Sequence, residues 1–466
     1  MLLSAPKSSG PPLLHKNALR ICNLPMPASV PTMMDMTVLA PESSLPPDSR
    51  PAKDSYRHLY ILLFVIGFLL RFAFVLWKKT YVGDELSNNP FGVEICSIAA
   101  HIVRSRGFSS PFHIDTGPTA WVPPVYPFFV ALVFRLFGSY TAASALVILG
   151  IQCAIAGATG VVIHALSRRT FGEQIGFFAA WIWTLSPIFF RWAVSWIWDF
   201  AASAFLLTAA FVVTMDVAEK NLRKHWLLLG ALWAIMALTN PALLSVMPFT
   251  FLYAAFKNHR AYRSWFAHLG LSCVLFAALV SPWLIRNALV FHRPVFFRSN
   301  FWFEFHLGNY HFSNGMGWAG KHPSGNPAVL KEYAAWGEMA FLDHYKQEGL
   351  RFVHEYPTEF RELTLHRAWW FWDGTPLHYQ ANEWWKPWEF WPLSLIGWLG
   401  LLFTLTRRPP GWFLYAAALI FYPLPYYFVY PVAKYRHAIE PALLLLSVYL
   451  VSVLWSEFRG LAHRKA

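Results

Sequence analysis

Two adjacent carboxylates, Asp84 and Glu85, lie in the stretch KKTYVGDELSNNP, shortly after an apolar run from Leu59 to Trp77. A third, Glu94, follows soon afterwards. Carboxylates beside a membrane can accept a proton as general bases or help to bind a divalent cation. We therefore treat these acids as candidate catalytic residues, although solvated acids that end a helix are the simpler alternative.

The residues around Glu94 have the spacing of an amphipathic helix. Apolar side chains recur at Ile95, Ile98, Ala99, Ile102 and Val103, whereas Glu94, Ser97, His101 and Arg104 share the opposite face. Such a helix lies in the membrane interface, so Glu94 is expected to point away from lipid.

Three cations at expected outer ends of apolar spans, Arg286, Lys434 and Arg436, are candidates for binding a phosphate group. Residues of this kind also anchor helices at the interface, and both roles stay open. Arg71 lies within the first apolar run and is expected to extend to the outer interface by snorkelling.

The composition is that of a polytopic membrane protein. Hydrophobic residues make up 56% of the 466 residues, charged residues 14%, and the mean hydropathy is +0.37. The net charge of +13 would suggest nucleic acid as a partner of a soluble protein. Here most Lys and Arg residues flank apolar spans, so we exclude nucleic acid. The four cysteines indicate neither a disulfide framework nor a metal site.

Apolar runs near the bilayer length of roughly 20 residues predict about ten transmembrane helices. They cover residues 59–77, 141–166, 174–190, 199–217, 225–240, 241–256, 266–288, 388–405, 411–429 and 437–455. The pair 225–256, interrupted at Asn240-Pro241, could be two spans or a re-entrant hairpin. The short apolar segment 125–138 is assigned to the outer interface, because only then do the basic links around Arg169 and Lys257 face the cytoplasm.

These spans predict the domain organisation of an all-α integral membrane protein. Residues 1–58 form a disordered cytoplasmic tail, with Met33, Met34 or Met36 as alternative starts. The parts that follow are a transmembrane core over 59–290 with an outer loop at 78–140, a larger outer segment over 291–387, three last helices within 388–456 and a cytoplasmic tail at 457–466. Interfacial helices are expected in the first outer loop.

An enzyme on the outer side has no access to cytoplasmic nucleotide sugars, so its substrate must arrive already activated. A polyprenyl-phosphate-linked sugar meets this need. Its transfer requires a carboxylate base near the acceptor hydroxyl and cations that stabilise the departing phosphate. The candidate acids and cations are of these two kinds.

The chain also resembles the C-type (GT-C) lipid-donor membrane glycosyltransferases of the protein O-mannosyltransferase kind (glycosyltransferase family 39) and the aminoarabinose transferase kind, including the RgtA/B/C/D-like bacterial branch. The resemblance extends over residues 59–455 and rests on the motifs GDE, GVEICSIAAHIVRSRGFSSPF, TGPTAWVPPVYPFFVALVFRLFG, SPWLIRN, FRSNFWFEFHLGN and KYRHAIEPALLLL. It implies a multi-span GT-C helical bundle.

The resemblance also implies roles for single residues. Asp84 and Glu85 match the family's catalytic or metal-linked acidic motif, and Asp199 matches a second acidic position. The substrate-loop element with two prolines and a tyrosine falls on Pro123, Pro124 and Tyr126. Val122 stands where aminoarabinose transferases place a lysine, which argues against lipid A as the acceptor.

Two further patterns carry no chemistry by themselves. GMGWAG, at 315–320, fits a nucleotide-binding glycine pattern but lacks the framing strand and helix, and a flexible loop over the site is the better interpretation. The histidines His306, His311, His322 and His344 lack metal-ligand spacing, so we expect interfacial or packing roles. A divalent metal ion is compatible with paired acids, but no ligand set is recognisable.

The hypothesis is an inverting glycosyltransferase that moves one hexose or pentose from a polyprenyl-phosphate donor to a glycan, lipid or protein acceptor. It would act on the outer, periplasmic face of the cytoplasmic membrane. A polysaccharide ligase or polymerase is the nearest alternative. A lipid-linked sugar transporter or flippase is more distant, because ionisable residues cluster at span ends and no internal repeat is visible.

Overall fold

The computed structural model describes residues 56–85, 90–260, 263–317, 319–374 and 386–465. Residues 1–55 of the expected tail, its alternative start positions and residues 375–385 of the larger outer segment therefore lie outside the described residues. Within the described part the chain is almost entirely helical, and β-type pairing is limited to two isolated bridges, Phe91 with Ile197 and Ser109 with Pro118. The predicted all-α fold class is confirmed.

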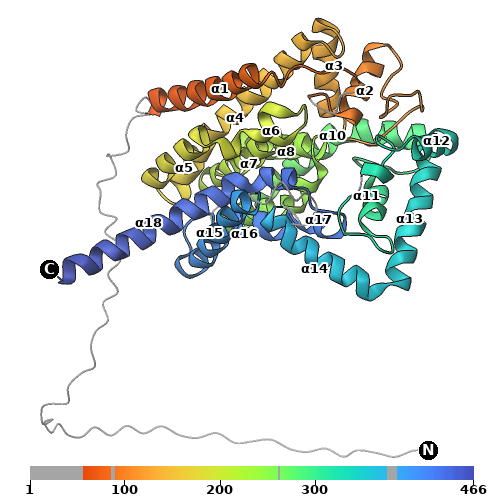
Figure 1. The fold of residues 1–466 in the computed structure, drawn as a ribbon. Helices are drawn as coiled ribbons and strands as arrows, with labels where there is room; N and C mark the ends of the chain where they lie inside the picture. The colour runs from red at the N-terminus through yellow and green to blue at the C-terminus, as the bar shows by residue number, and fades with distance from the viewer. Residues whose placement is uncertain (1–55, 86–89, 261–262, 318, 375–385, 466) are drawn as a thin grey trace, which may run out of the picture. The chain divides into compact units, whose positions relative to one another are not determined.

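The helices follow in chain order as α1 (Arg57–Lys78), α2 (Val93–Val103), α3 (Val125–Phe137), α4 (Ala142–Thr170), α5 (Glu173–Leu185), α6 (Arg191–Ser195), α7 (Phe200–Lys220), α8 (Arg223–Ala237), α9 (Met247–Asn258), α10 (Trp265–Phe291), α11 (Phe301–Gly308), α12 (Pro327–Trp336), α13 (Glu338–Glu355), α14 (Pro357–Asp373), α15 (Lys386–Arg407), α16 (Trp412–Phe421), α17 (Leu424–Phe428) and α18 (Glu440–Lys465). Short 3₁₀ turns include η2 (Pro187–Phe189), η3 (Pro241–Ser245), η4 (Ala319–Lys321) and η6 (Ala433–Ile439). Figure 1 shows their arrangement.

Among the described residues, 6 helical segments are long and apolar enough to cross a membrane, judged by length and composition. They are Arg57–Lys78, Ala142–Thr170, Phe200–Lys220, Trp265–Phe291, Phe390–Arg407 and Ala433–Gly460. The other expected spans also fall on helix, but the helices are shorter. Two of these runs are interrupted at Pro187 and Pro423, and 225–256 forms α8 and α9 joined by η3.

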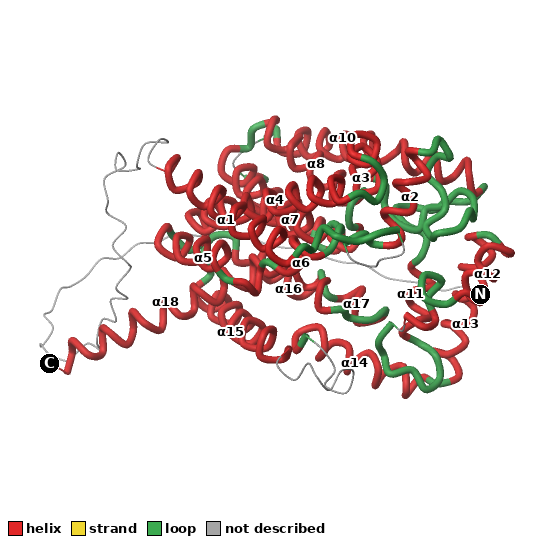
Figure 2. Tube along the Cα trace, turned by 45° about the horizontal axis from the view of Figure 1, so that its top comes forward, coloured by secondary structure: helices red, strands yellow, loops and turns green. Residues whose placement is uncertain are grey.

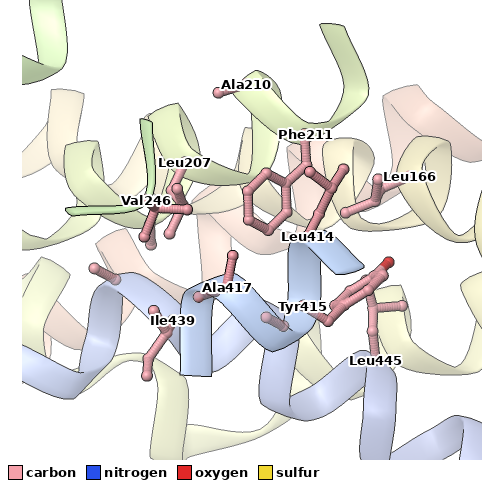
Figure 3. Packing of buried hydrophobic residues seen from close by; sticks show 14 of the residues in the cluster. Leu166, Leu207, Ala210, Phe211, Val246, Leu414, Tyr415, Ala417, Ile439 and Leu445 are labelled. Atoms are coloured by element: carbon pink, nitrogen blue, oxygen red, sulfur yellow. The ribbon is translucent and has the colours of Figure 1, made fainter. Parts of the chain in front are cut away.

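The long helices pack around α4 and α7. α4 contacts α1, α5 and α7, α8 packs against α7 and α10, and α18 packs against α15 and α5. A Cβ atom added at Gly157 would lie 2.9 Å from the backbone oxygen of Phe64, so this glycine permits the close approach of α1 and α4. Figure 3 shows the core, where Phe211 of α7 faces Leu414 of α16 and Leu207 of α7 lies beside Val246.

Arg71 does not snorkel, so that prediction is wrong. Its side chain is fully buried, and its guanidinium donates hydrogen bonds to the carbonyl oxygens of Trp183 at 2.8 Å and Thr184 at 3.2 Å. These carbonyls lie at the C-terminal end of α5, where backbone acceptors lack helical partners. A cation placed there compensates both the unpaired acceptors and the negative end of the helix.

A second apolar cluster joins the two expected outer segments to the adjoining ends of the long helices. It includes Val75 of α1, Ile95 of α2, Ile148 of α4 and Phe341 of α13, together with Trp121, whose ring contacts that of Phe341. Figures 1 and 2 both show α2, α3 and α11–α13 gathered at one end of the described bundle. The helix ends on that side therefore support a folded layer made from both segments.

Candidate active site

A cavity of about 570 Å³ lies where this layer meets the helix ends. Its wall comes from the start of α2, the loop before α3, the residues before α7, the α8–η3 junction, the segment from Phe296 to Leu307 and the residues around α17 and η6. The charged and polar side chains in the lining include Glu94, Asp199, Asn240, Arg298, Asn300, Glu304, His322 and Lys434. Segments far apart in the sequence thus bring acids and cations to one chamber of a size suited to a small ligand.

Glu94 lies in the first turn of α2, where the helix dipole favours a negative charge. Its side chain is largely buried, and its Oε1 lies 3.6 Å from Nε2 of His322. The position of α2 is fixed by Ser97, one turn further along the helix, whose hydroxyl donates to the carbonyls of Ser110 and Phe112. The carboxylate is therefore presented to the cavity by a supported helix.

Asp199 precedes α7 and is buried beside the cavity. It accepts a hydrogen bond of 2.7 Å from the Ser203 hydroxyl, which in turn accepts one from Asn240. Burial raises the pKa of Asp199 above the ordinary carboxyl value, because the charged form loses hydration. A third acid, Glu304, accepts hydrogen bonds from the Asn300 amide and the Tyr430 hydroxyl.

Two cations line the same cavity. The ammonium of Lys434 lies 3.7 Å from the centre of the Trp196 ring and is attracted electrostatically by Glu94, Glu304 and Asp199. Arg298 donates from Nε to Asn300 at 2.6 Å and lies 3.9 Å from Glu304. Its guanidinium has further donors that a bound anion can accept from.

Aromatic rings form much of the remaining wall. They include Trp121, Tyr126, Trp196, Trp198, Tyr426, Tyr430 and Tyr435. The Tyr126 hydroxyl donates to Gln152, whose amide donates to the carbonyls of Ala193 at 3.1 Å and Trp196 at 2.9 Å. Tyr126 thus holds the segment that carries Trp196, in addition to lining the cavity.

Glu338 fixes the loop that leads to Trp121. Its oxygens accept hydrogen bonds from the hydroxyls of Thr119, Ser299 and Tyr333 and from the N–H of Ala120. Burial nevertheless outweighs these hydrogen bonds and raises the pKa of Glu338. This carboxyl ties the first outer segment to the second.

The structure brings together some of the residues proposed from sequence. Glu94, Asp199, Lys434, Pro123 and Tyr126 line the cavity. Pro124 contributes instead to a neighbouring apolar cavity of about 700 Å³ between α2, α3, α8 and α10.

Asp84 and Glu85 do not line the cavity of about 570 Å³ that contains Glu94. Glu85 is 4.0 Å from Arg104, at the far end of α2 from Glu94. At about 1.5 Å per residue, the two ends are separated by about 15 Å.

The other proposed cations are engaged elsewhere. Arg286 lines the apolar cavity and donates to the carbonyls of Thr119 at 2.7 Å and Phe108 at 2.8 Å. Arg436 is fully buried, lies 3.3 Å from Glu440 and donates to the Ser394 hydroxyl at 2.7 Å. These contacts lie outside the lining of the cavity that contains Glu94, and phosphate binding by Arg286 and Arg436 stays a prediction.

Sequence reasoning missed Arg298, Glu304 and His322. The first two lie in the stretch FRSNFWFEFHLGN, whose resemblance to the family does not indicate a role for its charged residues. His322 is one of the histidines for which the sequence predicts an interfacial or packing role. Within the described residues, groups of three or more His, Cys, Asp or Glu side chains arranged to hold a metal ion are absent, so metal binding stays a prediction.

Residues 121–285 match the family model of dolichyl-phosphate-mannose-protein mannosyltransferases. The apo oligosaccharyltransferase of Archaeoglobus fulgidus is similar in structure, with a TM-score of 0.50 and 14% identity over 88% of this chain and 52% of that one. ArnT from Cupriavidus metallidurans bound to undecaprenyl phosphate gives a TM-score of 0.40 and 13% identity over 85% of this chain and 78% of that one. No curated protein matches the chain.

The chain spans about half the length of the archaeal enzyme that it resembles, since it covers 52% of that chain. The resemblance to C-type membrane glycosyltransferases expected from sequence is confirmed by the matched family model and by this fold. The many apolar helices are those of a membrane protein.

Proposed function

We propose that this protein transfers a sugar from a polyprenyl-phosphate donor to an acceptor hydroxyl on the outer face of the cytoplasmic membrane. The family whose model matches residues 121–285 is named for a donor of this class, a dolichyl-phosphate mannose. The acceptor is a glycan, a lipid or a protein, and the sugar is a hexose or a pentose.

One observation carries the proposal. Glu94, Lys434 and Arg298 all line the same cavity at the helix ends, and the wall of this cavity is otherwise largely apolar. A lipid-linked phosphate keeps its tail in the bilayer, so its head must be bound near a membrane boundary. Lys434 precedes α18 and Arg298 follows α10, so both cations stand at ends of long helices. The electrostatic attraction between a phosphate and these cations is strong there, because the cavity is partly desolvated.

In the proposed reaction Glu94 takes the proton of the acceptor hydroxyl while the acceptor oxygen bonds to the anomeric carbon. The bond from that carbon to the phosphate oxygen breaks, and its electron pair leaves with the lipid phosphate. Lys434 and Arg298 stabilise the negative charge on this leaving group. A single displacement of this kind inverts the configuration at the anomeric carbon.

Among the candidate acids, the geometry favours Glu94 as the base. Asp199 is more deeply buried and already hydrogen-bonded to Ser203, which suits a residue that shapes the charge of the cavity. Asp84 and Glu85 remain candidates from the family motif, and their position outside the cavity lining makes them the weaker ones. Aromatic rings such as Trp198 and Tyr435 offer faces on which a sugar can stack.

The test uses the purified full chain in lipid nanodiscs, with a radiolabelled polyprenyl-phosphate sugar and cell-envelope extract as the source of acceptor. Transfer of label with release of polyprenyl phosphate is expected, and Glu94→Gln should slow both by about two to four decades. Label that moves only from a lipid-diphosphate glycan would indicate a ligase. Mass spectrometry of surface glycans and glycoproteins from a deletion strain would then identify the acceptor.

A further inference from the structure

His322 has a position that an interfacial or packing role does not explain. Its side chain is 11% exposed, and the ring is surrounded by Phe112, Trp121 and Phe303, with ring centres 5.7, 5.9 and 5.6 Å away. His322 nevertheless belongs to the lining of the cavity that contains Glu94. It comes from the second outer segment, directly after η4, whereas Glu94 belongs to the first.

The contacts of the Nδ1 atom fix the position of the ring proton. The backbone N–H of Ser324 points at Nδ1 over 3.2 Å, and the Ser324 hydroxyl lies 2.7 Å from the same atom. A backbone amide can only donate, so Nδ1 must carry a lone pair. The neutral ring therefore holds its proton on Nε2.

That Nε2–H faces the carboxylate of Glu94. The distance from Nε2 to Oε1 is 3.6 Å, slightly longer than a hydrogen bond. Contacts of catalytic groups are often long without substrate and shorten when substrate binds. A movement of about half an ångström would bring this pair into hydrogen-bond range.

We infer that His322 is the positioning residue of Glu94. The inference rests on the proposed function, in which Glu94 is the base. A hydrogen bond from Nε2 occupies one lone pair of Oε1 and fixes the plane of the carboxylate, which leaves its other lone pairs for the acceptor hydroxyl. The arrangement of a base held by a third group is the one that activates nucleophiles in many enzymes.

The other charged groups at the cavity support this division of roles. Lys434 attracts Glu94 from η6, and Arg298 belongs to the segment after α10. Glu304 and Asp199 add negative charge from α11 and from the residue before α7. The electrostatic attraction between Lys434 and Glu94 has no preferred direction. The orientation of the Glu94 carboxylate is therefore set by the directional N–H group of His322.

Two substitutions distinguish the effect of the His322 N–H group from the effect of its aromatic ring. His322→Phe keeps an aromatic ring among Phe112, Trp121 and Phe303 but has no donor. His322→Gln loses the ring but carries an amide N–H close to the position of Nε2. We expect kcat to fall about tenfold to hundredfold in the Phe variant, as for loss of a hydrogen bond to a charged group, with donor KM unchanged. The Gln variant should recover most of kcat.

The measurements are kcat and donor KM in nanodiscs, with thermal unfolding to confirm that each variant is folded. A Phe variant as active as wild type, or equal losses in both folded variants, would overturn the inference, because the N–H would then not matter. In the Glu94→Gln background, His322→Phe should add no further loss, and a multiplicative loss would contradict action through Glu94. Retained transfer in Glu94→Gln alone would instead overturn the proposed base.

Discussion

The ammonium group of Lys434 lies 3.7 Å from the centre of the Trp196 ring, inside the cavity that also contains Glu94. A cation over an aromatic face is attracted by the ring while its N–H groups stay available to an anion. The Trp196 carbonyl accepts a hydrogen bond from Gln152, which Tyr126 also contacts. The residue matched to the substrate loop thus supports the place where a donor phosphate would meet Lys434.

Replacement of Lys434 by Met keeps the apolar stem over Trp196 and removes the charge. A charged hydrogen bond in a partly dry site contributes about 1.5 to 3 kcal/mol, so donor affinity should fall by one to two decades. The measurement is equilibrium binding of the polyprenyl-phosphate sugar in nanodiscs. Arg293→Met is the matched control, because Arg293 pairs with Asp343 at 2.6 Å outside the cavity lining. Unchanged affinity in the Lys434 variant would remove this residue from the site.

Arg436 should behave differently from Lys434. Replacement by Met removes the guanidinium partner of buried Glu440 and leaves His437 at 2.7 Å, so the cost in the free energy of unfolding should be about 1 to 3 kcal/mol, less than for a fully unpaired buried charge. We expect a lower apparent unfolding temperature in detergent and normal donor affinity in the folded fraction. If the variant were as stable as wild type but bound donor weakly, the phosphate-binding role proposed from sequence would be supported instead.

Glu94→Gln and Asp84→Asn together identify the base. Loss of a general base typically lowers the rate by two to four decades, and we expect this loss in the Glu94 variant with donor binding retained. Asp84→Asn should keep transfer within a few-fold of wild type. Single-turnover transfer with prebound donor is the measurement. The reverse result would return the base to the GDE motif and would require Asp84 to enter the cavity when substrate is bound.

Much of the fold could be predicted from the sequence because membrane insertion depends on the length and polarity of apolar runs, which are visible directly. The expected spans all fall on helix, including runs interrupted at Pro187 and Pro423. Arg71 shows the limit of this reasoning. Its partners are the end carbonyls of a helix more than a hundred residues away, at a sequence separation of 113 for Thr184. Hydropathy carries no information on such a contact.

The site was predictable only in part, for a related reason. Glu94 and Lys434 could be found because charged side chains at the ends of apolar spans require an explanation. Arg298 and His322 belong to the second outer segment, where the pattern of apolar residues does not show which loop reaches which helix end. Their role depends on tertiary contacts such as those of Glu338, which joins that segment to the loop before α3.

Glu338 also predicts a pH dependence of stability. Its pKa in the folded protein is raised by burial, so the unfolded chain loses its proton first as pH rises. The stability that it contributes is complete below the ordinary carboxyl pKa of about 4 and is lost as pH rises through the raised value. Glu338→Gln should therefore reduce the decline in apparent unfolding temperature from acidic to neutral pH.

Asp115→Asn is the control of opposite sign for this experiment. Asp115 is exposed, and the hydrogen bond from Ser110 lowers its pKa. Wild type should therefore gain a little stability relative to this variant as pH rises. Identical pH slopes for wild type and Glu338→Gln would show that the buried carboxyl is not penalised by its surroundings.

The membrane topology gives the last prediction, and the site assignment depends on it. Asp84 and the loop around Gly315 should face outward, whereas Arg169 and Lys257 should face the cytoplasm. Cysteine labelling with an impermeant reagent tests this. Gly315 itself is a poor position, because its φ is +79° and an added Cβ would lie 3.1 Å from Leu363. Phe312 is 85% exposed and replaces it.

The labelling background first needs Cys22→Ser and Cys273→Ala, since Cys273 is exposed and Cys96 and Cys153 are buried. Positions 84 and 312 should then react from outside in intact cells, and positions 169 and 257 only after permeabilisation. α3 has 13 residues and is about 20 Å long, too short for a hydrocarbon layer of about 30 Å. If position 169 reacted from outside, α3 would have to span the membrane. The layer that holds Glu94 and His322 would then be divided between its two sides, and the proposed active site could not exist.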